Sequence, residues 1–151
     1  QIDEEHLFQS VHNLVVHTHS HPHTLTSARN FTQILIELSK RAEIRNVLNT
    51  FRMSEVPLNK IKAWENMPDR RVVGETLSTA CYLPESFTAA LYFAWKYSDD
   101  FSLAVLANAK VGGDNCHRGV VVGSIVAMQT GIPEKWLRDL KCMDELRCDH
   151  S

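Results

Sequence analysis

Two adjacent glycines, Gly112 and Gly113, separate two apolar segments, and this break constrains the fold more than any other feature of the sequence. Glycine adopts positive φ at no steric cost, so a glycine pair permits a tight reversal of the chain. The segment before the pair and residues 120–127 after it are apolar enough to be buried. Asp114 follows the pair at the position of a helix N-cap. We therefore predict two helices joined by a turn that presents polar side chains where the second helix begins.

Apolar side chains recur every three or four residues through most of the chain, as in amphipathic helices. Glycine and proline are sparse, and no segment has the alternating pattern of a strand. A chain of this length can bury roughly two-thirds of its unfolded surface. We predict one all-α domain over residues 1–151, a compact orthogonal bundle of about 7–8 helices, with a tail at 139–151 that frays. The expected helices cover residues 3–17, 27–41 (capped by Thr24 or Thr26), 42–51, 58–64, 86–97, 99–111 (capped by Ser98 or Asp99), 114–130 and a last one from Pro133.

The charge pattern argues against nucleic-acid or membrane partners. The net charge is −2, from 16 basic and 18 acidic residues that are interspersed along the chain. The uncharged apolar run at residues 120–132 is shorter than the roughly 20 residues that span a bilayer. We expect a cytoplasmic protein with reduced cysteines. The chain begins at Gln1 and enters an amphipathic pattern at once, so we expect it to be part of a longer protein.

Four histidines alternate with other residues between His17 and His23. Pro22 disfavours a helix through this segment and pushes His21 towards extended geometry. In an extended segment, alternate side chains point to the same side, which would make a metal or phosphate site. The alternative is a polar loop with partly exposed imidazoles.

Several segments resemble the ADP-ribosylglycohydrolase family, which is related to dinitrogenase-reductase-activating glycohydrolase. The resemblance is closer over residues 75–137 than over 5–50, and it indicates the C-terminal part of a longer family domain. The segments that carry it are Gly112-Gly113-Asp114, residues 82–91 (YLPESFTAAL), residues 101–109 (FSLAVLANA), residues 132–136 (IPEKW) and His21-Pro22.

The resemblance implies an all-α hydrolase that cleaves the N- or O-glycosidic bond between ADP-ribose and a protein side chain or small molecule. Such enzymes use two Mg²⁺ or Mn²⁺ ions, held by an N-terminal Thr-Asp-Asp cluster and by a Gly-Gly-Asp-x-Asp-Thr motif. Hard cations of this kind prefer oxygen ligands and can orient water and ribose hydroxyls. ADP-ribose or an ADP-ribosylated molecule is the implied partner.

The sequence departs from this pattern in two ways. It contains no Thr-Asp-Asp cluster, and Cys116 and His117 stand where the motif has its second Asp and its Thr. A thiol and an imidazole suit zinc better than magnesium, so the candidate metal ligands are Asp114, Cys116 and His117. A soft-metal site shared with the histidine segment is a further alternative. The alternative to a hydrolase is a non-catalytic helical module that binds ADP-ribose or a protein partner.

Each candidate residue also has an ordinary structural interpretation. Asp114 and His117 are the candidate catalytic residues, but Asp114 could simply cap a helix and His117 could be an exposed histidine. Cys116 could be a nucleophile or part of a small packing face with Gly119 and Gly123. Arg118 could contact a pyrophosphate or pair with Asp114 one turn away. The candidate substrate-binding residues are Gly112, Gly113, Arg118, Glu85, Ser86 and His21.

The three tryptophans are expected to pack in or against the core. Trp95 could instead line an adenine pocket.

Overall fold

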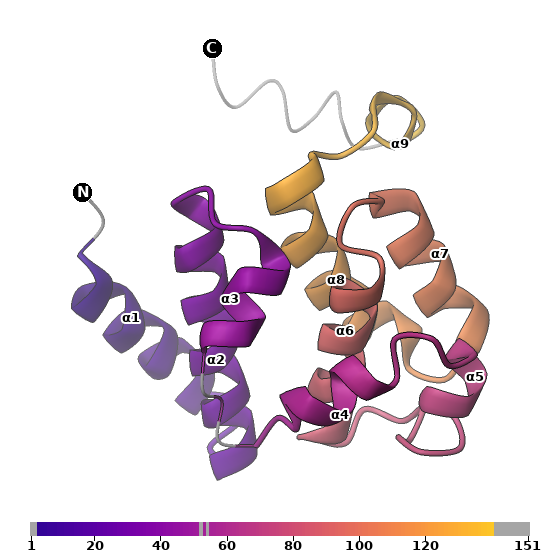
Figure 1. Ribbon diagram of the computed structural model, residues 1–151. Coiled ribbons are helices and arrows are strands. Elements are labelled where there is room, and N and C mark those ends of the chain that lie inside the picture. The colour runs from indigo at the N-terminus through magenta and orange to yellow at the C-terminus, as the bar shows by residue number, and fades with distance from the viewer. Residues whose placement is uncertain (1–2, 52, 54, 141–151) are drawn as a thin grey trace.

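The computed structural model describes residues 3–51, 53 and 55–140, and within them the chain folds into helices (Figure 1). Apart from an isolated bridge between Val73 and Leu77, these residues form no β-structure. The predicted all-α class is therefore confirmed. The nine helices of the described residues are α1 (Glu4–Val16), α2 (Pro22–Ser39), α3 (Ile44–Thr50), α4 (Leu58–Ala63), α5 (Asp69–Val72), α6 (Glu85–Lys96), α7 (Phe101–Val111), α8 (Asn115–Thr130) and α9 (Glu134–Arg138).

Two predicted helix starts are wrong. Helix α2 begins at Pro22 rather than at Ser27, and its N-cap is His21 rather than Thr24 or Thr26. Proline is favoured at the first helical position because its missing N–H would be unpaired there anyway. Helix α7 is capped by Asp100, whose carboxylate accepts the backbone N–H of Leu103 at 2.8 Å. The predicted tail at 139–151 falls, beyond Leu140, outside the described residues.

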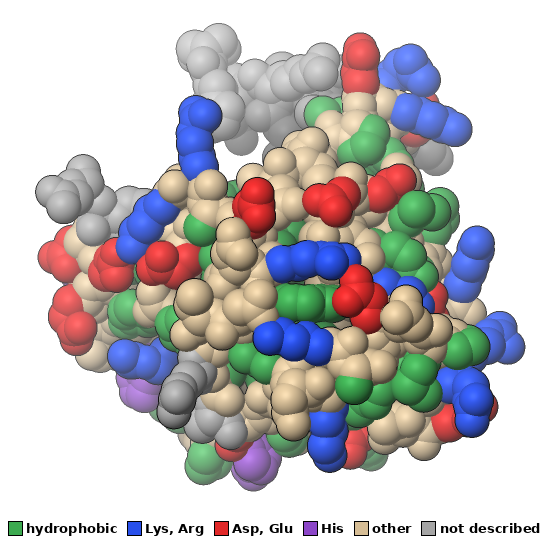
Figure 2. Space-filling model, viewed as in Figure 1, with side chains coloured by type: hydrophobic (Ala, Val, Ile, Leu, Met, Phe, Trp, Pro, Cys, Tyr) green, Lys and Arg blue, Asp and Glu red, His purple; other side chains and the backbone are tan. Residues whose placement is uncertain are grey.

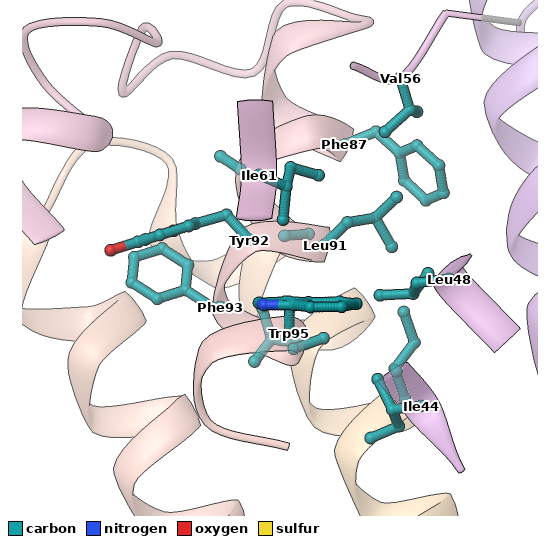
Figure 3. Close-up of a cluster of buried hydrophobic side chains, with 14 of the residues drawn as sticks. Ile44, Leu48, Val56, Ile61, Phe87, Leu91, Tyr92, Phe93 and Trp95 are labelled. Atoms are coloured by element: carbon teal, nitrogen blue, oxygen red, sulfur yellow. The ribbon is translucent and has the colours of Figure 1, made fainter. Parts of the chain in front are cut away.

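Helix α6 forms the centre of the hydrophobic core. Every residue from Phe87 to Trp95 is buried, so this helix is covered on all sides. Figure 3 shows Leu91 and Trp95 reaching toward Ile44 and Leu48 of α3. Ile61 of α4 is also fully buried in this cluster, which joins three helices that are far apart in the sequence.

Helix α8 packs against four other helices, α2, α3, α6 and α7 (Figure 1). Its small residues permit the close approach to α7. A Cβ at Gly119 would lie 3.1 Å from the side-chain nitrogen of Asn108, and one at Gly123 would lie 3.9 Å from the Phe101 ring. Helix α1 packs against α2 and has no buried residue of its own. The packing of α8 against these helices fixes the position of its first residues, which follow the glycine turn.

A half-buried carboxylate ties α5 to the end of α6. Asp69 accepts hydrogen bonds from Lys96 Nζ, Tyr92 Oη and Tyr97 Oη, each at 2.8 Å. Burial alone would raise the pKa of Asp69, but these three donated hydrogen bonds outweigh it and lower the pKa below its usual value. Burial and the neighbouring carboxylate raise the pKa of Tyr97 to about 12.

Replacing Asp69 by Asn should lower the free energy of unfolding at neutral pH by about 1–2 kcal/mol, because Lys96 loses a charged acceptor in a half-buried site. The Asp69 carboxylate binds protons less readily in the folded state than in the unfolded state. Its contribution is therefore present above the ordinary aspartate pKa of about 4 and is lost as the pH falls further. Urea unfolding between pH 7 and pH 3 measures this. A variant whose stability falls with acid as steeply as the wild type would contradict it.

Charged side chains are mixed over the molecular face in Figure 2, where red and blue groups lie next to one another and next to green ones. Within the described part of the chain, no helix combines the length and hydropathy required to cross a lipid bilayer.

Candidate functional site

A cleft of about 1080 Å³ lies between the ends of four helices: the C-terminal end of α1 and the N-terminal ends of α2, α6 and α8. Its walls bring together segments that are distant in the sequence. His21 and His23 come from the start of α2, Ser86 from the start of α6, and Asp114 and His117 from the start of α8. The histidine segment and the glycine turn therefore meet at one cavity.

The glycine turn has the predicted geometry. Gly112 and Gly113 have φ values of 76° and 66°, in the left-handed region that favours glycine. A Cβ on Gly113 would collide with the backbone of Thr79, so this position also needs glycine for space. The backbone N–H of Asp114 donates to the Thr79 carbonyl oxygen at 2.9 Å. These contacts hold the turn at the cleft wall.

Asp114 occupies the N-cap position of α8, but its carboxylate makes no capping hydrogen bond. Instead, Asp114 Oδ1 lies 2.7 Å from His117 Nδ1. The Asp114 side chain is 25% exposed and the His117 side chain 87%. Because a carboxylate accepts hydrogen bonds, the neutral imidazole must carry its proton on Nδ1, which leaves Nε2 able to accept a proton. The expected side-chain cap is thus replaced by a carboxylate–imidazole dyad.

Arg118 does not pair with Asp114 as one interpretation predicted, because its guanidinium donates elsewhere. It is 2% exposed and donates to Asn108 Oδ1 at 2.6 Å, to the Gly112 carbonyl at 2.9 Å and to the Thr79 carbonyl at 3.3 Å. Burial lowers the pKa of Arg118, and the negative charge of Asp114 partly offsets this. Although Arg118 reaches the cleft wall, its N–H groups are directed at the protein's own carbonyls.

The histidine segment is not extended as predicted. His17 has helical geometry at the end of α1, and His23 lies inside the first turn of α2. His21 is extended, and its Nδ1 accepts the backbone N–H of His23 at 3.2 Å. Because Pro22 starts the helix instead of excluding it, the four imidazoles do not share one side of a strand. His19, His21 and His23 nevertheless line the cleft.

The family model for ADP-ribosylglycohydrolase matches residues 2–149, nearly the whole chain. The chain belongs to the ADP-ribosylglycohydrolase family. No curated protein and no solved structure matched the chain significantly. The resemblance seen in the glycine turn is therefore confirmed as family membership.

The described residues of this ADP-ribosylglycohydrolase-family chain do not assemble a metal site. No group of three or more His, Cys, Asp or Glu side chains among them is arranged to hold a metal ion. Asp114 supplies the only carboxylate on the described cleft wall, whereas a hard divalent cation takes several oxygen ligands. Cys116 is exposed and does not line the cleft, so the predicted set of Asp114, Cys116 and His117 is not brought together around one cavity.

The remaining predicted residues divide between the cleft and the surrounding structure. Ser86 lines the cleft, but Glu85 does not; its carboxylate accepts the backbone N–H of Ser78 at 2.9 Å. Cys116 does not take part in the small packing face, because it is exposed. Trp95 is buried in the core and is absent from the cleft wall, so it packs as expected rather than offering a face for adenine.

Sequence reasoning missed two residues at this site. Tyr82 is 72% exposed and lines the cleft, although it begins one of the segments that carry the family resemblance. Glu55 lies between α3 and α4, and its Oε1 is 2.7 Å from His23 Nδ1. The partners are 32 positions apart, and nothing local in the sequence signals their contact.

Proposed function

We propose that the cleft binds ADP-ribose and that the full-length protein hydrolyses the glycosidic bond between ADP-ribose and a protein side chain or small molecule. The family supports the substrate class. The observation that carries the proposal is the Asp114–His117 dyad on the cleft wall, 2.7 Å between Oδ1 and Nδ1. Asp114 is the carboxylate of the family's glycine motif, so the family signature and the cavity coincide at this residue.

The dyad suits activation of water. Asp114 holds the His117 imidazole with its proton on Nδ1, and Nε2 can then accept a proton from a water molecule in the cleft. The water oxygen forms a bond to the anomeric carbon of the ribose, the bond to the leaving group breaks, and the leaving group takes up a proton.

A second candidate is a non-catalytic module that binds ADP-ribose or a protein partner. It is favoured by the single carboxylate among the described cleft residues, because the family's chemistry draws on several acids. Under this alternative the cleft would still bind the ligand, because binding does not need the further acids that hydrolysis requires.

Two measurements on the full-length protein distinguish these candidates. Turnover of ADP-ribosyl-arginine and ADP-ribosyl-serine peptides, with Mg²⁺ or Mn²⁺ present, is expected for the hydrolase. Calorimetric titration with ADP-ribose, in Mg²⁺ and then in a chelator, is expected to show binding for the hydrolase and for an ADP-ribose-binding module. Chelator-insensitive binding without turnover would favour the binding module. Neither binding nor turnover would refute both the hydrolase and an ADP-ribose-binding module, and would leave the module that binds a protein partner.

A further inference from the structure

A second carboxylate–imidazole dyad lies at the same cleft. Glu55 Oε1 is 2.7 Å from His23 Nδ1, the same separation as between Asp114 and His117. The His23 side chain is 43% exposed and lines the cleft, while the Glu55 side chain behind it is 26% exposed. One dyad comes from the start of α2 and the other from the start of α8.

The hydrogen bond made by Nδ1 determines whether Nε2 of each neutral imidazole carries a proton. Nδ1 of His23 faces a carboxylate, which only accepts, so this nitrogen carries a proton and Nε2 remains for exchange with a ligand. His21, whose ring centroid is 5.0 Å from that of His23, is the opposite case. Its Nδ1 accepts a backbone N–H, so its neutral ring carries the proton on Nε2. Of these two neighbours, only His23 is supported by a carboxylate.

The environment of the Glu55 carboxylate is unusual for an ionisable group. Its Oε2 is buried and has no hydrogen-bond partner among the described residues. A buried carboxylate oxygen without a partner costs stability, and such groups in native proteins call for an explanation. Orientation of the His23 imidazole explains the position of Glu55, because this role needs only the hydrogen bond through Oε1.

We infer that His23 is a second proton-transfer residue of the cleft, the general acid that protonates the leaving group, and that Glu55 is its positioning residue. This rests on the proposed function. His117, the more exposed imidazole, accepts the proton of the attacking water through Nε2. His23, protonated on both nitrogens, donates from Nε2 to the nitrogen or oxygen that leaves the anomeric carbon. One proton is taken up and one is given, and solvent restores both histidines.

The test compares two substrates of the full-length protein that differ only in the leaving group. An ADP-ribosyl-serine peptide releases an alkoxide, which needs a proton, whereas a para-nitrophenyl ADP-ribose releases a stable phenolate. His23→Asn is expected to lower turnover of the peptide by about 10²–10⁴-fold and to leave turnover of the nitrophenyl compound within about tenfold. Glu55→Gln is expected to show the same split with a smaller loss, because the imidazole remains but is misoriented.

The matched controls are His12→Asn and Glu75→Gln. His12 is exposed on α1, and Glu75 forms an exposed pair with Arg71. Both should leave the two rates unchanged. Equal losses on both substrates in His23→Asn would indicate a merely structural role and overturn the inference, as would unchanged rates. A wild type that hydrolyses neither substrate would refute the proposed hydrolysis, and with it the acid role.

A second readout does not depend on activity. Two-bond ¹H–¹⁵N correlation spectra distinguish the two neutral tautomers of histidine. In the wild type His23 should carry its proton on Nδ1, and in Glu55→Gln this preference should be lost or reversed. An Nε2-protonated His23 in the wild type, or the same tautomer in both proteins, would overturn the dyad even if turnover is observed.

Discussion

Replacing Asp114 by Asn should lower turnover of an ADP-ribosylated peptide by about 10²–10⁴-fold in the full-length protein. The amide has nearly the shape of the carboxylate but carries no charge, and its NH₂ group would donate to His117 Nδ1 instead of accepting from it. The neutral imidazole would then hold its proton on Nε2, where it can no longer accept one from water. Carboxylate-to-amide changes at other His–Asp pairs cause large losses for the same reason.

The stability of the fold should not change with this substitution. Asp114 makes no side-chain capping bond, so Asp114→Asn is expected to change the free energy of unfolding by less than about 0.5 kcal/mol. Asp100→Asn is the matched control. Asp100 truly caps its helix, through Leu103, and asparagine caps about as well as aspartate. Peptide turnover and urea unfolding of both variants make the comparison.

The outcomes separate the roles of Asp114. Activity lost in Asp114→Asn but retained in Asp100→Asn would identify Asp114 as a working member of the cleft. Wild-type activity in Asp114→Asn would remove Asp114 from the mechanism. A large loss of stability in Asp114→Asn would instead indicate that the carboxylate supports the turn.

The helices were predictable because their signals are local. A repeat of 3.6 residues identifies a helix face wherever it occurs, and positive φ at Gly112, Gly113 and Gly131 ends α7 and α8 where the sequence predicted. The error at Pro22 is also local. Proline both excludes a helix interior and favours a helix start, and the sequence pattern does not say which applies.

The interactions that define the site are not local. Glu55 pairs with His23 across 32 positions, Arg118 reaches Thr79 across 39, and Asp69 reaches Tyr97 across 28. Taken alone, each of these residues would be interpreted as an exposed polar side chain or as one member of a local pair. Only the tertiary fold, which brings distant segments together, determines which of these groups meet.

Arg118 shows how this changes a functional assignment. From the motif, a guanidinium beside the glycine turn indicates a pyrophosphate contact or an ion pair with Asp114. In the fold, the α7–α8 contact encloses the side chain and surrounds it with carbonyl oxygens. Guanidinium groups suit such a place because their five N–H donors have fixed directions. Its contribution to the site is therefore to hold the turn that carries Asp114.

Replacing Arg118 by Met should lower the free energy of unfolding by about 3–5 kcal/mol, because several buried or partly buried oxygens lose their donor at about 1–3 kcal/mol each. The methionine fills part of the space but leaves the oxygens of Asn108, Gly112 and Thr79 without their donor. For a chain of this size the midpoint of thermal unfolding should fall by roughly 10 °C. Arg118→Lys should be intermediate, because one ammonium cannot reach oxygens on several sides.

Arg71→Met is the matched control, since Arg71 forms only an exposed pair with Glu75 and should change stability by less than about 0.5 kcal/mol. Calorimetric unfolding of the three variants, with and without ADP-ribose, distinguishes a structural from a ligand-contacting Arg118. If the ligand contact dominates, Arg118→Met would unfold like the wild type without ligand and lose its stabilisation by ADP-ribose. If the turn depends on Arg118, the loss appears without ligand, and Arg118→Lys recovers part of it because a charged donor still reaches the nearest carbonyl.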